Sequence, residues 1–338
     1  MVCWLANSLT SHGYKVLLLS LDDSGASSFY SLDPAVEWVR LGKLSQYNRT
    51  RQQLAIFKQF GVECLIAFVA SGDRTLYVSA KLAGAKIVIA ERNAPSMYKI
   101  RFSLLQRLMS FSLMHLADRI TVQQREFIAD YPSTLRSRSR CIPNPVNIPI
   151  TYSKPMVSIN GRYSILTVSR LDGVQKGIPH LIHAFKLVCD AFPDWDVVIV
   201  GAGPQLDYLK RLVEEQELSS RVIFAGEMSE VSHYYLRAHL FVIPSLWEGF
   251  PNALAEAMSY GLPSIGFEEA KGVSSLISDK VGWLASGLEN PYSLAESMSI
   301  AMSSPIDRAD KGACARQKMY NYKPDVQILF WAKLIEEI

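Results

Sequence analysis

The 338-residue sequence lacks several features that would each assign it to a particular class of protein. Its five cysteines are scattered and form no C-x-x-C pair, so neither a zinc site nor a disulfide framework is expected, which fits a reducing cytosol. No apolar run reaches the ~20 residues that span a bilayer, and no basic start precedes an apolar core at the N-terminus. The net charge of +3 is too small to argue for nucleic acid as a partner.

The composition that is present, 49% hydrophobic and 20% charged, is typical of a globular protein long enough for two domains. Predicted helices and apolar strands alternate along the chain in two runs. The first ends near residue 141, and the second extends from Tyr163 to about residue 318. Prolines between Pro143 and Pro155 mark a linker between the runs. This alternation predicts an α/β fold with parallel sheets and helical crossovers.

The most informative segment reads E-G-F-P-N-A-L-A-E from Glu248 to Glu256. It follows an apolar strand predicted over 240–244, and Pro251 and Gly261 mark the start and end of a predicted helix over 252–260. A strand, a short turn and a helix N-terminus form an anion site, because backbone N–H groups and the helix dipole point the same way. The two carboxylates would repel phosphate but can accept hydrogen bonds from hydroxyls. Together these groups predict a site for a nucleotide sugar.

This segment resembles the E-x7-E signature of the retaining glycosyltransferases of family 4, which have the GT-B fold. Three other segments resemble that family in the same order. They are S-R-L at 169–171 followed by K-G at 176–177, G-A-G-P at 201–204, and the strand R-V-I-F-A-G at 221–226. The resemblance is strong over residues 160–265 and looser elsewhere.

The resemblance implies two Rossmann-like domains that face a central cleft. Residues 1–148 would bind the acceptor, residues 149–318 would bind the nucleotide sugar, and residues 319–338 would form a C-terminal helix that returns to the first domain. One feature departs from the family, because the chain begins with a predicted helix where relatives begin with a strand and a glycine-rich turn. We therefore expect the first domain to be incomplete, with two strands lacking ladder partners. The alternative is that members of the family vary in this N-terminal strand and turn, and that the domain is intact.

Site residues follow from the resemblance by position. Arg170 and Lys176 would stabilise the charge that develops on the departing diphosphate, Glu248 would lie near the 3-hydroxyl of the sugar, and Glu256 would hold the ribose hydroxyls. The resemblance also implies donor contacts from residues at the turns and at the helix start: Gly203, Gly226, Gly249, Phe250, Pro251 and Asn252. The alternative is that the cations and carboxylates are ordinary surface charges. Under the family assignment, Lys176→Ala should lose turnover with little change in melting temperature.

Three further patterns each have a simpler interpretation. Glu91-Arg92-Asn93 stands where many relatives carry a histidine, so Arg92 is a candidate contact for an acceptor or donor phosphate, or else a structural residue. Asp194-Trp195-Asp196 resembles the metal-binding D-x-D of another glycosyltransferase class but is better explained as a turn before a strand. Leu206 replaces the third glycine of a dinucleotide fingerprint. No metal or other cofactor is therefore expected.

A long helix is predicted over residues 96–117, and its part from 98 to 116 mixes basic and apolar residues. Between residues 99 and 140 three acidic residues interrupt a series of eight basic ones: Lys99, Arg101, Arg107, Arg119, Arg125, Arg136, Arg138 and Arg140. Such a helix can lie on an anionic membrane surface. It can equally pack against a core and leave its charges in water.

The resemblance thus implies a metal-independent, retaining transferase of cell-surface polysaccharide or lipopolysaccharide biosynthesis. It would move a UDP-linked hexose or N-acetylhexosamine to a glycan or polyprenyl-linked acceptor, in the cytoplasm or peripherally on the inner face of the membrane. Two alternatives stay open. One is a donor-binding remnant without turnover, and the other is a nucleotide-sugar epimerase of GT-B architecture.

Overall fold

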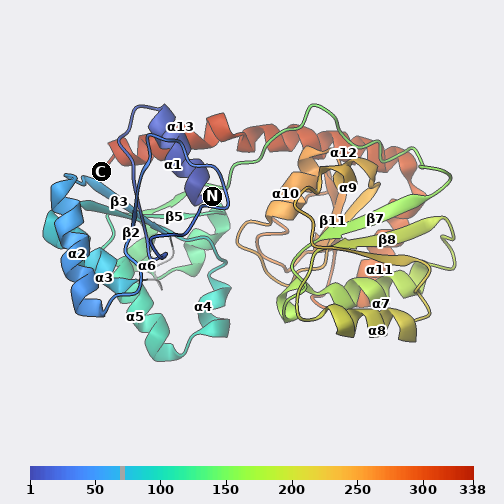
Figure 1. The fold of residues 1–338 in the computed structure, drawn as a ribbon. Coiled ribbons are helices and arrows are strands. Elements are labelled where there is room, and N and C mark those ends of the chain that lie inside the picture. Colours follow the sequence, from blue (N-terminus) through green and yellow to red (C-terminus); the bar gives the residue numbers. More distant parts are fainter. Residues whose placement is uncertain (69–72) are drawn as a thin grey trace. The chain divides into compact units, whose positions relative to one another are not determined.

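A computed structural model describes residues 1–68 and 73–338 of the chain. It divides into two compact units, residues 1–144 with 324–338 and residues 145–323. Every strand pair that joins named strands is parallel, and helices connect the strands (Figure 1). The α/β fold with parallel sheets, expected from the alternation of elements, is confirmed. Within the described residues, no helix has the length and hydropathy needed to cross a bilayer.

The second unit is built on a six-stranded sheet in the order β12-β11-β10-β7-β8-β9. Its strands are β7 (Tyr163–Val168), β8 (Trp195–Val200), β9 (Val222–Gly226), β10 (Leu240–Ile243), β11 (Ser264–Phe267) and β12 (Gly282–Ala285). Both β10 and β11 are buried along their whole length, as expected for central strands covered on both faces. The chain adds strands first on one side of β7 and then, from β10 onward, on the other. Such a reversal opens a crevice at the carboxyl ends of the two central strands.

Helices surround this sheet and complete its core. They are α7 (Ile178–Val188), α8 (Leu206–Glu215), α9 (Ser232–Arg237), α10 (Asn252–Ser259), α11 (Pro291–Ser303) and α12 (Pro305–Met319), with short 3-10 turns η2 (Val174–Lys176) and η3 (Tyr320–Tyr322). The helix predicted over 252–260 is confirmed as α10, one residue shorter. Gly261 follows it with φ +79°, the left-handed conformation that ends many helices.

The first unit contains two separate sheets. One has four strands, β3 (Cys64–Phe68), β4 (Lys86–Ala90), β5 (Arg119–Val122) and β6 (Ser139–Cys141), and the other is the pair β1 (Leu17–Ser20) and β2 (Glu37–Arg40). Among the described residues, β1 pairs only with β2, and β3 pairs only with β4. In the part of the chain that the structure describes, β1 and β3 are therefore edge strands of their sheets.

The helices of the first unit include one from the end of the chain. They are α1 (Val2–Ser11), α2 (Gln46–Gln59), α3 (Arg74–Ala83), α4 (Ser96–Arg101), α5 (Leu104–Met114), the 3-10 turn η1 (Arg125–Asp130), α6 (Ser133–Arg136) and α13 (Pro324–Glu336). Figure 1 shows α13 beside α1. Trp331 and Leu334 of α13 share a buried cluster with Leu5 of α1 and Val88 of β4. The last helix is thus part of the core of the first unit.

One predicted element is wrong. The sequence suggested a single long helix over 96–117, but the structure has two helices, α4 and α5, separated at Phe102. Phe102 is extended, with φ −118° and ψ 138°. Ser103 then caps α5: its hydroxyl accepts from the Gln106 N–H, and the Gln106 side chain accepts from the Ser103 N–H. This S-x-x-Q capping box was present in the sequence and explains the break.

The packing of α13 generates a stability prediction with a control on the same helix. Trp331→Ala should lower the free energy of unfolding by about 3–5 kcal/mol, because it removes a fully buried indole. Phe330→Ala, one residue away and 49% exposed, should cost less than about 1 kcal/mol. Urea unfolding of the full chain followed by circular dichroism measures both. Equal effects of the two substitutions would contradict the placement of α13 in the core.

Candidate functional site

Most of the candidate residues lie at one edge of the six-stranded sheet of the second unit, beyond the carboxyl ends of its strands. Arg170 follows β7, Lys176 lies in η2, Gly203 follows β8, and Glu248 lies between β10 and α10. Since all these strands are parallel, their carboxyl ends meet at the same edge. The edge includes the β7–β10 junction, where the strand order reverses and where α/β sheets bind ligands.

Lys176 and Glu248 are in direct contact. The Lys176 Nζ lies 2.6 Å from the Glu248 Oε1, and only 15% and 11% of the two side chains are exposed. The loops that carry them are also joined through Gln175. Its side-chain amide donates to the Trp247 carbonyl at 2.9 Å, and its own carbonyl accepts from the Leu246 N–H at 2.8 Å. Two motifs that are 72 residues apart in the sequence therefore form one local structure.

Glycines permit this close approach of backbones. Gly177, the glycine of the K-G motif, has φ +61°, and a Cβ there would lie 2.0 Å from the Pro244 carbonyl oxygen. Gly272 has φ +86°, and a Cβ there would lie 2.2 Å from the Glu248 carbonyl oxygen. Any side chain at either position would push the Glu248 loop away. These glycines therefore set the position of the carboxylate.

The G-A-G-P turn fixes the segment that carries Arg170. A Cβ on Gly201 would lie 1.8 Å from the Ser169 carbonyl oxygen, and one on Gly203 would lie 2.4 Å from the Leu171 carbonyl oxygen. The Leu171 N–H donates to the Ala202 carbonyl at 2.8 Å, and the Gln205 N–H donates to the Leu171 carbonyl at 3.0 Å. The turn after β8 is thus hydrogen-bonded to Leu171, the residue after Arg170, and lies against the backbone of Ser169, the residue before it.

Arg170 itself is exposed. Its Nη1 lies 2.9 Å from the Asp172 Oδ2, and 73% of its side chain is accessible. An ion pair in water contributes roughly 0–1 kcal/mol, so an incoming anion can replace Asp172 at little cost. Both candidate cations, Arg170 and Lys176, therefore already have a carboxylate partner, one weakly held and one largely buried.

Glu256 lies in the second turn of α10 and is bonded to a tyrosine. The Tyr235 hydroxyl of α9 donates to the Glu256 Oε2 at 3.0 Å, and the Tyr235 ring stacks on that of Tyr260, with centroids 5.2 Å apart. Burial raises the pKa of the Glu256 carboxyl, and the hydrogen bond from Tyr235 opposes part of this rise. The Glu256 carboxylate is thus a hydrogen-bond acceptor held in place by Tyr235, and burial makes its ionised form less favourable.

The remaining donor-site candidates surround the start of α10. Pro251 is the residue before the first helical residue, and the first amides of an α-helix have no acceptor within the helix. The Phe250 side chain is buried, with its ring 5.7 Å from that of Tyr322, so its contribution to a ligand would come from its backbone, as for Gly249 and Asn252. Gly226 ends β9, and its carbonyl accepts from the Gly201 N–H at 2.8 Å.

Arg92 belongs to the first unit, whereas the other candidate residues belong to the second. Its guanidinium donates to the Ile142 carbonyl, the Asn144 Oδ1 and the Thr121 Oγ1, each at 3.3 Å. Burial lowers the pKa of the Arg92 guanidinium to about 10, while the charge of Glu91 acts in the opposite direction. Much of its hydrogen-bonding capacity is therefore used within the fold.

In the D-x-D segment, the carboxylate of Asp196 pairs with two arginines. Arg162 donates from Nε to the Asp196 Oδ2 at 2.6 Å, and the Arg221 Nε lies 3.1 Å from the Asp196 Oδ1. Trp195 between the two aspartates is buried in β8. Within residues 1–68 and 73–338, no group of three or more His, Cys, Asp or Glu side chains is arranged to hold a metal ion.

Several residues that shape the site were missed from the sequence. Gln175 and Gly272 join the Glu248 loop to its neighbours, Tyr235 holds Glu256, and Asp172 pairs with Arg170. Asp172 and Gln175 lie inside the matched motif and could have been found there. Tyr235 and Gly272 belong to no motif, and only the three-dimensional contacts identify them.

Comparison with known proteins gives the site a context. Residues 152–318 match the family described as glycosyl transferases group 1. Over 313 residues the chain is 24% identical to an uncharacterized glycosyltransferase of Haemophilus influenzae, covering 89% of this chain and 85% of the relative. It is 33% identical over 96 residues to the lipopolysaccharide core biosynthesis mannosyltransferase LpsB of Rhizobium meliloti, covering only 27% of each protein.

Solved structures share the fold. Sucrose-phosphate synthase of Thermosynechococcus elongatus superposes with a TM-score of 0.79 at 19% identity, covering 99% of this chain and 92% of that one. HepE of Anabaena, in complex with UDP, also gives 0.79 at 14% identity, covering 96% and 100%. At these identities the similarity establishes the GT-B fold alone.

The Lys176–Glu248 contact changes the expectation that Lys176 substitutions would leave stability untouched. Lys176→Met leaves the largely buried Glu248 carboxylate without its cation, so the free energy of unfolding should fall by about 2 kcal/mol. The double variant Lys176→Met/Glu248→Gln should recover at least half of that loss. Lys186→Met, which removes a partly exposed cation, should cost less than about 0.5 kcal/mol. Urea unfolding of the full chain measures these free energies. A Lys176→Met protein as stable as the wild type would contradict the pairing.

The raised pKa of Glu256 predicts a pH-dependent contribution to stability. The folded state binds this proton more tightly than the unfolded state, so its contribution is full below the unfolded pKa and is lost as pH rises through the folded pKa. The stability of Glu256→Gln relative to the wild type should therefore rise over that window and then level off. Tyr235→Phe removes a hydrogen bond that lowers the pKa, so it should extend the window upward. Unfolding measured from pH 4 to 8 tests both, and a pH-independent difference would refute the assignment.

Proposed function

We propose that this chain, a group 1 glycosyltransferase by its residues 152–318, transfers a sugar from a UDP-linked donor to a glycan or polyprenyl-linked acceptor with retention of configuration. The observation that carries the proposal is the contact of Lys176 with Glu248 at the edge where β7 and β10 meet. A cation for phosphate and a carboxylate for hydroxyls are adjacent there, in the crevice typical of nucleotide sites.

In the proposed reaction, the bond between the anomeric carbon and the diphosphate oxygen breaks, and negative charge grows on the diphosphate. Arg170 and Lys176 would stabilise this charge, with the first-turn amides of α10. Arg170 would exchange Asp172 for phosphate oxygens. Lys176 would share its charge with phosphate, which frees Glu248 to accept a hydrogen bond from a sugar hydroxyl. Binding energy would then be used where charge develops rather than in the ground state.

The other candidates receive roles in the same scheme. Glu256, held by Tyr235, would accept from the ribose hydroxyls, and the backbones of Gly203, Gly226 and residues 249–252 would approach the donor. We keep Arg92 as a candidate phosphate contact, which would require its guanidinium to exchange one of its present partners. No metal is included, because the two cations and the helix amides supply the positive charge.

The choice of donor and acceptor class comes from similar proteins. HepE was solved with UDP, which supports a UDP-linked hexose or N-acetylhexosamine. LpsB is named for lipopolysaccharide core biosynthesis, which supports a cell-surface glycan acceptor. We accordingly propose a cytoplasmic enzyme, peripheral on the inner face of the membrane.

A donor screen tests the proposal. UDP-sugars should raise the melting temperature of the purified chain, since a ligand at 100 times its dissociation constant adds about 2.7 kcal/mol. Arg170→Gln should lower kcat/KM by about 10²–10³ without loss of stability, because this side chain is 73% exposed. Arg211→Gln, an exposed arginine of α8, should behave as the wild type. The anomeric configuration of the product, read by NMR, tests retention.

Two outcomes would overturn the proposal, and a third would overturn the role of one residue. Conversion of the donor into a second nucleotide sugar without acceptor would indicate an epimerase. UDP binding without turnover towards any acceptor would indicate a donor-binding remnant. Unchanged kcat/KM in Arg170→Gln would remove the role given to that residue.

A further inference from the structure

The helix α5 presents an apolar face to solvent. Its most exposed large side chains are Leu104, Leu105, Leu108 and Met109, accessible by 62%, 68%, 54% and 39%. Residues at these spacings lie on one side of an α-helix. We call these four residues the α5 face. An apolar stripe normally faces the core, so an exposed one marks an interaction surface.

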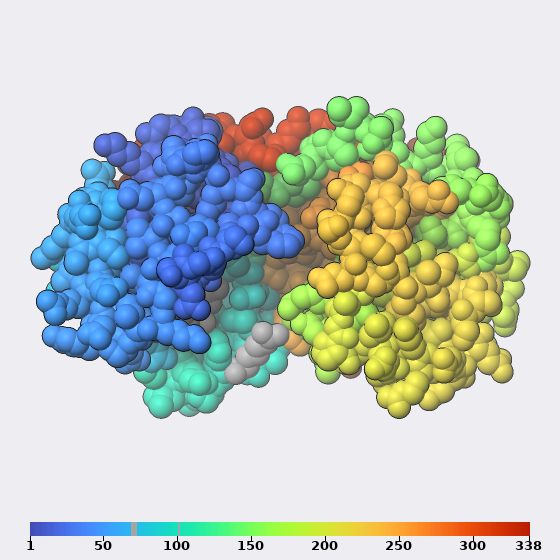
Figure 2. Space-filling model, in the orientation of Figure 1, coloured from blue at the N-terminus to red at the C-terminus, as the bar shows by residue number. Residues whose placement is uncertain are grey.

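The opposite side of α5 is already packed. Met114 and Ser110 on that side are buried, and Phe111, at the border of the α5 face, has its ring 5.3 Å from that of Tyr98 and 6.2 Å from that of Tyr131. The helix therefore has its core contacts without the α5 face. Figure 2 shows this segment, in teal, at the surface of the first unit.

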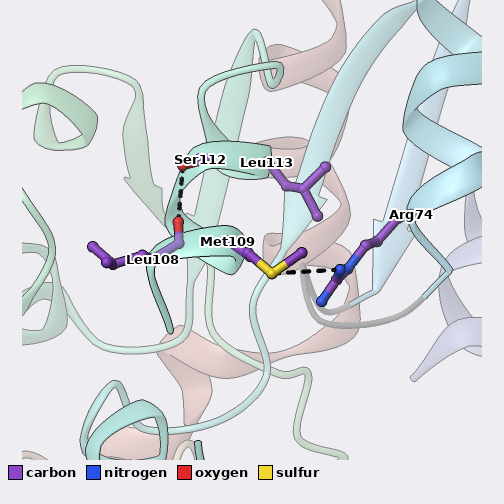
Figure 3. A pocket seen from close by; sticks show the side chains of 5 residues that line it. All are labelled: Arg74, Leu108, Met109, Ser112 and Leu113. Atoms are coloured by element: carbon purple, nitrogen blue, oxygen red, sulfur yellow. Dashed lines mark hydrogen bonds between the residues drawn. The ribbon is translucent and has the colours of Figure 1, made fainter. Parts of the chain in front are cut away.

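A hollow next to the α5 face brings in a cation from α3. Arg74, Leu108, Met109, Ser112 and Leu113 line it. The Arg74 Nη1 lies 3.8 Å from the Met109 Sδ, and Figure 3 shows the two side chains pointing toward each other. The volume of the hollow, about 290 Å³, is at the lower limit of small-molecule sites, about 300–1,000 Å³. None of the candidate donor residues lines this hollow.

The segment that carries the α5 face contains basic residues and no acidic ones. No Asp or Glu occurs between Glu91 and Asp118. Lys99 and Ile100 are exposed on α4, Arg107 lies on α5, and Arg74 borders the hollow. Of the basic residues predicted for this stretch, Arg101 has a side chain outside the described part of the structure. An apolar stripe with a cationic border matches the interface of an anionic bilayer, with acyl chains below and phosphates above.

We propose that the α5 face, together with Ile100, inserts into the interfacial region of an anionic membrane, with Arg74, Lys99 and Arg107 at the level of the lipid phosphates. The inference rests on the proposed peripheral location and names the surface that provides it. A second copy of the chain fits less well. Two turns of one helix offer much less than the roughly 1,200–2,000 Å² of a stable interface, and a two-fold contact would bring the cations together.

Vesicle co-sedimentation of the full chain tests the proposal. The wild type should partition at least tenfold better onto vesicles of 70% phosphatidylcholine and 30% phosphatidylglycerol than onto pure phosphatidylcholine. Salt should weaken the binding. Leu105→Gln/Leu108→Gln should reduce partitioning at least tenfold, and Lys99→Gln about fivefold. The matched control Ile306→Gln/Leu329→Gln alters equally exposed apolar residues elsewhere and should bind as the wild type.

Two further measurements make each outcome decisive. UDP-induced thermal stabilisation of Leu105→Gln/Leu108→Gln should equal that of the wild type, so a loss of vesicle binding cannot be ascribed to unfolding or to the donor site. Failure of UDP binding with intact vesicle binding would overturn the proposed function alone. Wild-type vesicle binding by Leu105→Gln/Leu108→Gln, or equal binding to both vesicle types, would overturn the membrane inference. So would a dimer, seen by sedimentation velocity, that this double variant dissociates.

Discussion

The candidate site depends on the close approach of backbones at the carboxyl edge of the second sheet. Gly177 against Pro244, Gly201 against Ser169 and Gly203 against Leu171 leave no room for a Cβ. These contacts fix three loops relative to one another before any side chain acts. The Lys176–Glu248 ion pair then forms across two of these loops because their backbones are already adjacent. Preorganisation of this kind allows charges to act on a transition state without reorganising first.

The charge balance of the site follows from the same geometry. Each candidate cation has a carboxylate partner, but the two partnerships differ in cost. Asp172 pairs with Arg170 in water, where exchange of the partner costs little, whereas Glu248 pairs with Lys176 where only 11% and 15% of the two side chains are exposed. A diphosphate can therefore recruit Arg170 freely, but it must share Lys176. This inequality explains why the two cations should respond differently to substitution, one in turnover alone and the other in stability as well.

Much of the second unit could be predicted from the sequence because its signals are local. The buried strands are continuous apolar runs, and Pro251 and Gly261 bracket α10 as expected. Partners brought together by folding could not be predicted in this way. Nothing near Glu256 in the sequence points to Tyr235, and nothing in the E-R-N motif shows that Arg92 bonds to Ile142 and Asn144. The break at Phe102 is different, since its signal, the S-x-x-Q capping box at Ser103, is present in the sequence beside the apolar periodicity that predicted one helix.

The α5 face shows that hydrophobic periodicity can predict a helix without predicting which of its sides is buried. Leu104, Leu105 and Leu108 lie on one side of α5 and the buried Met114 on the other, with Phe111 at the border, so the hydrophobic pattern does not decide which side faces the core. The neighbours decide. Tyr98 and Tyr131 provide a wall for Phe111, and their hydroxyls both reach the buried Glu91 carboxylate. Turning α5 to bury its leucines would remove Phe111 from this wall. The polar network beneath the helix therefore selects which apolar side faces inward, and it leaves the leucines for another partner.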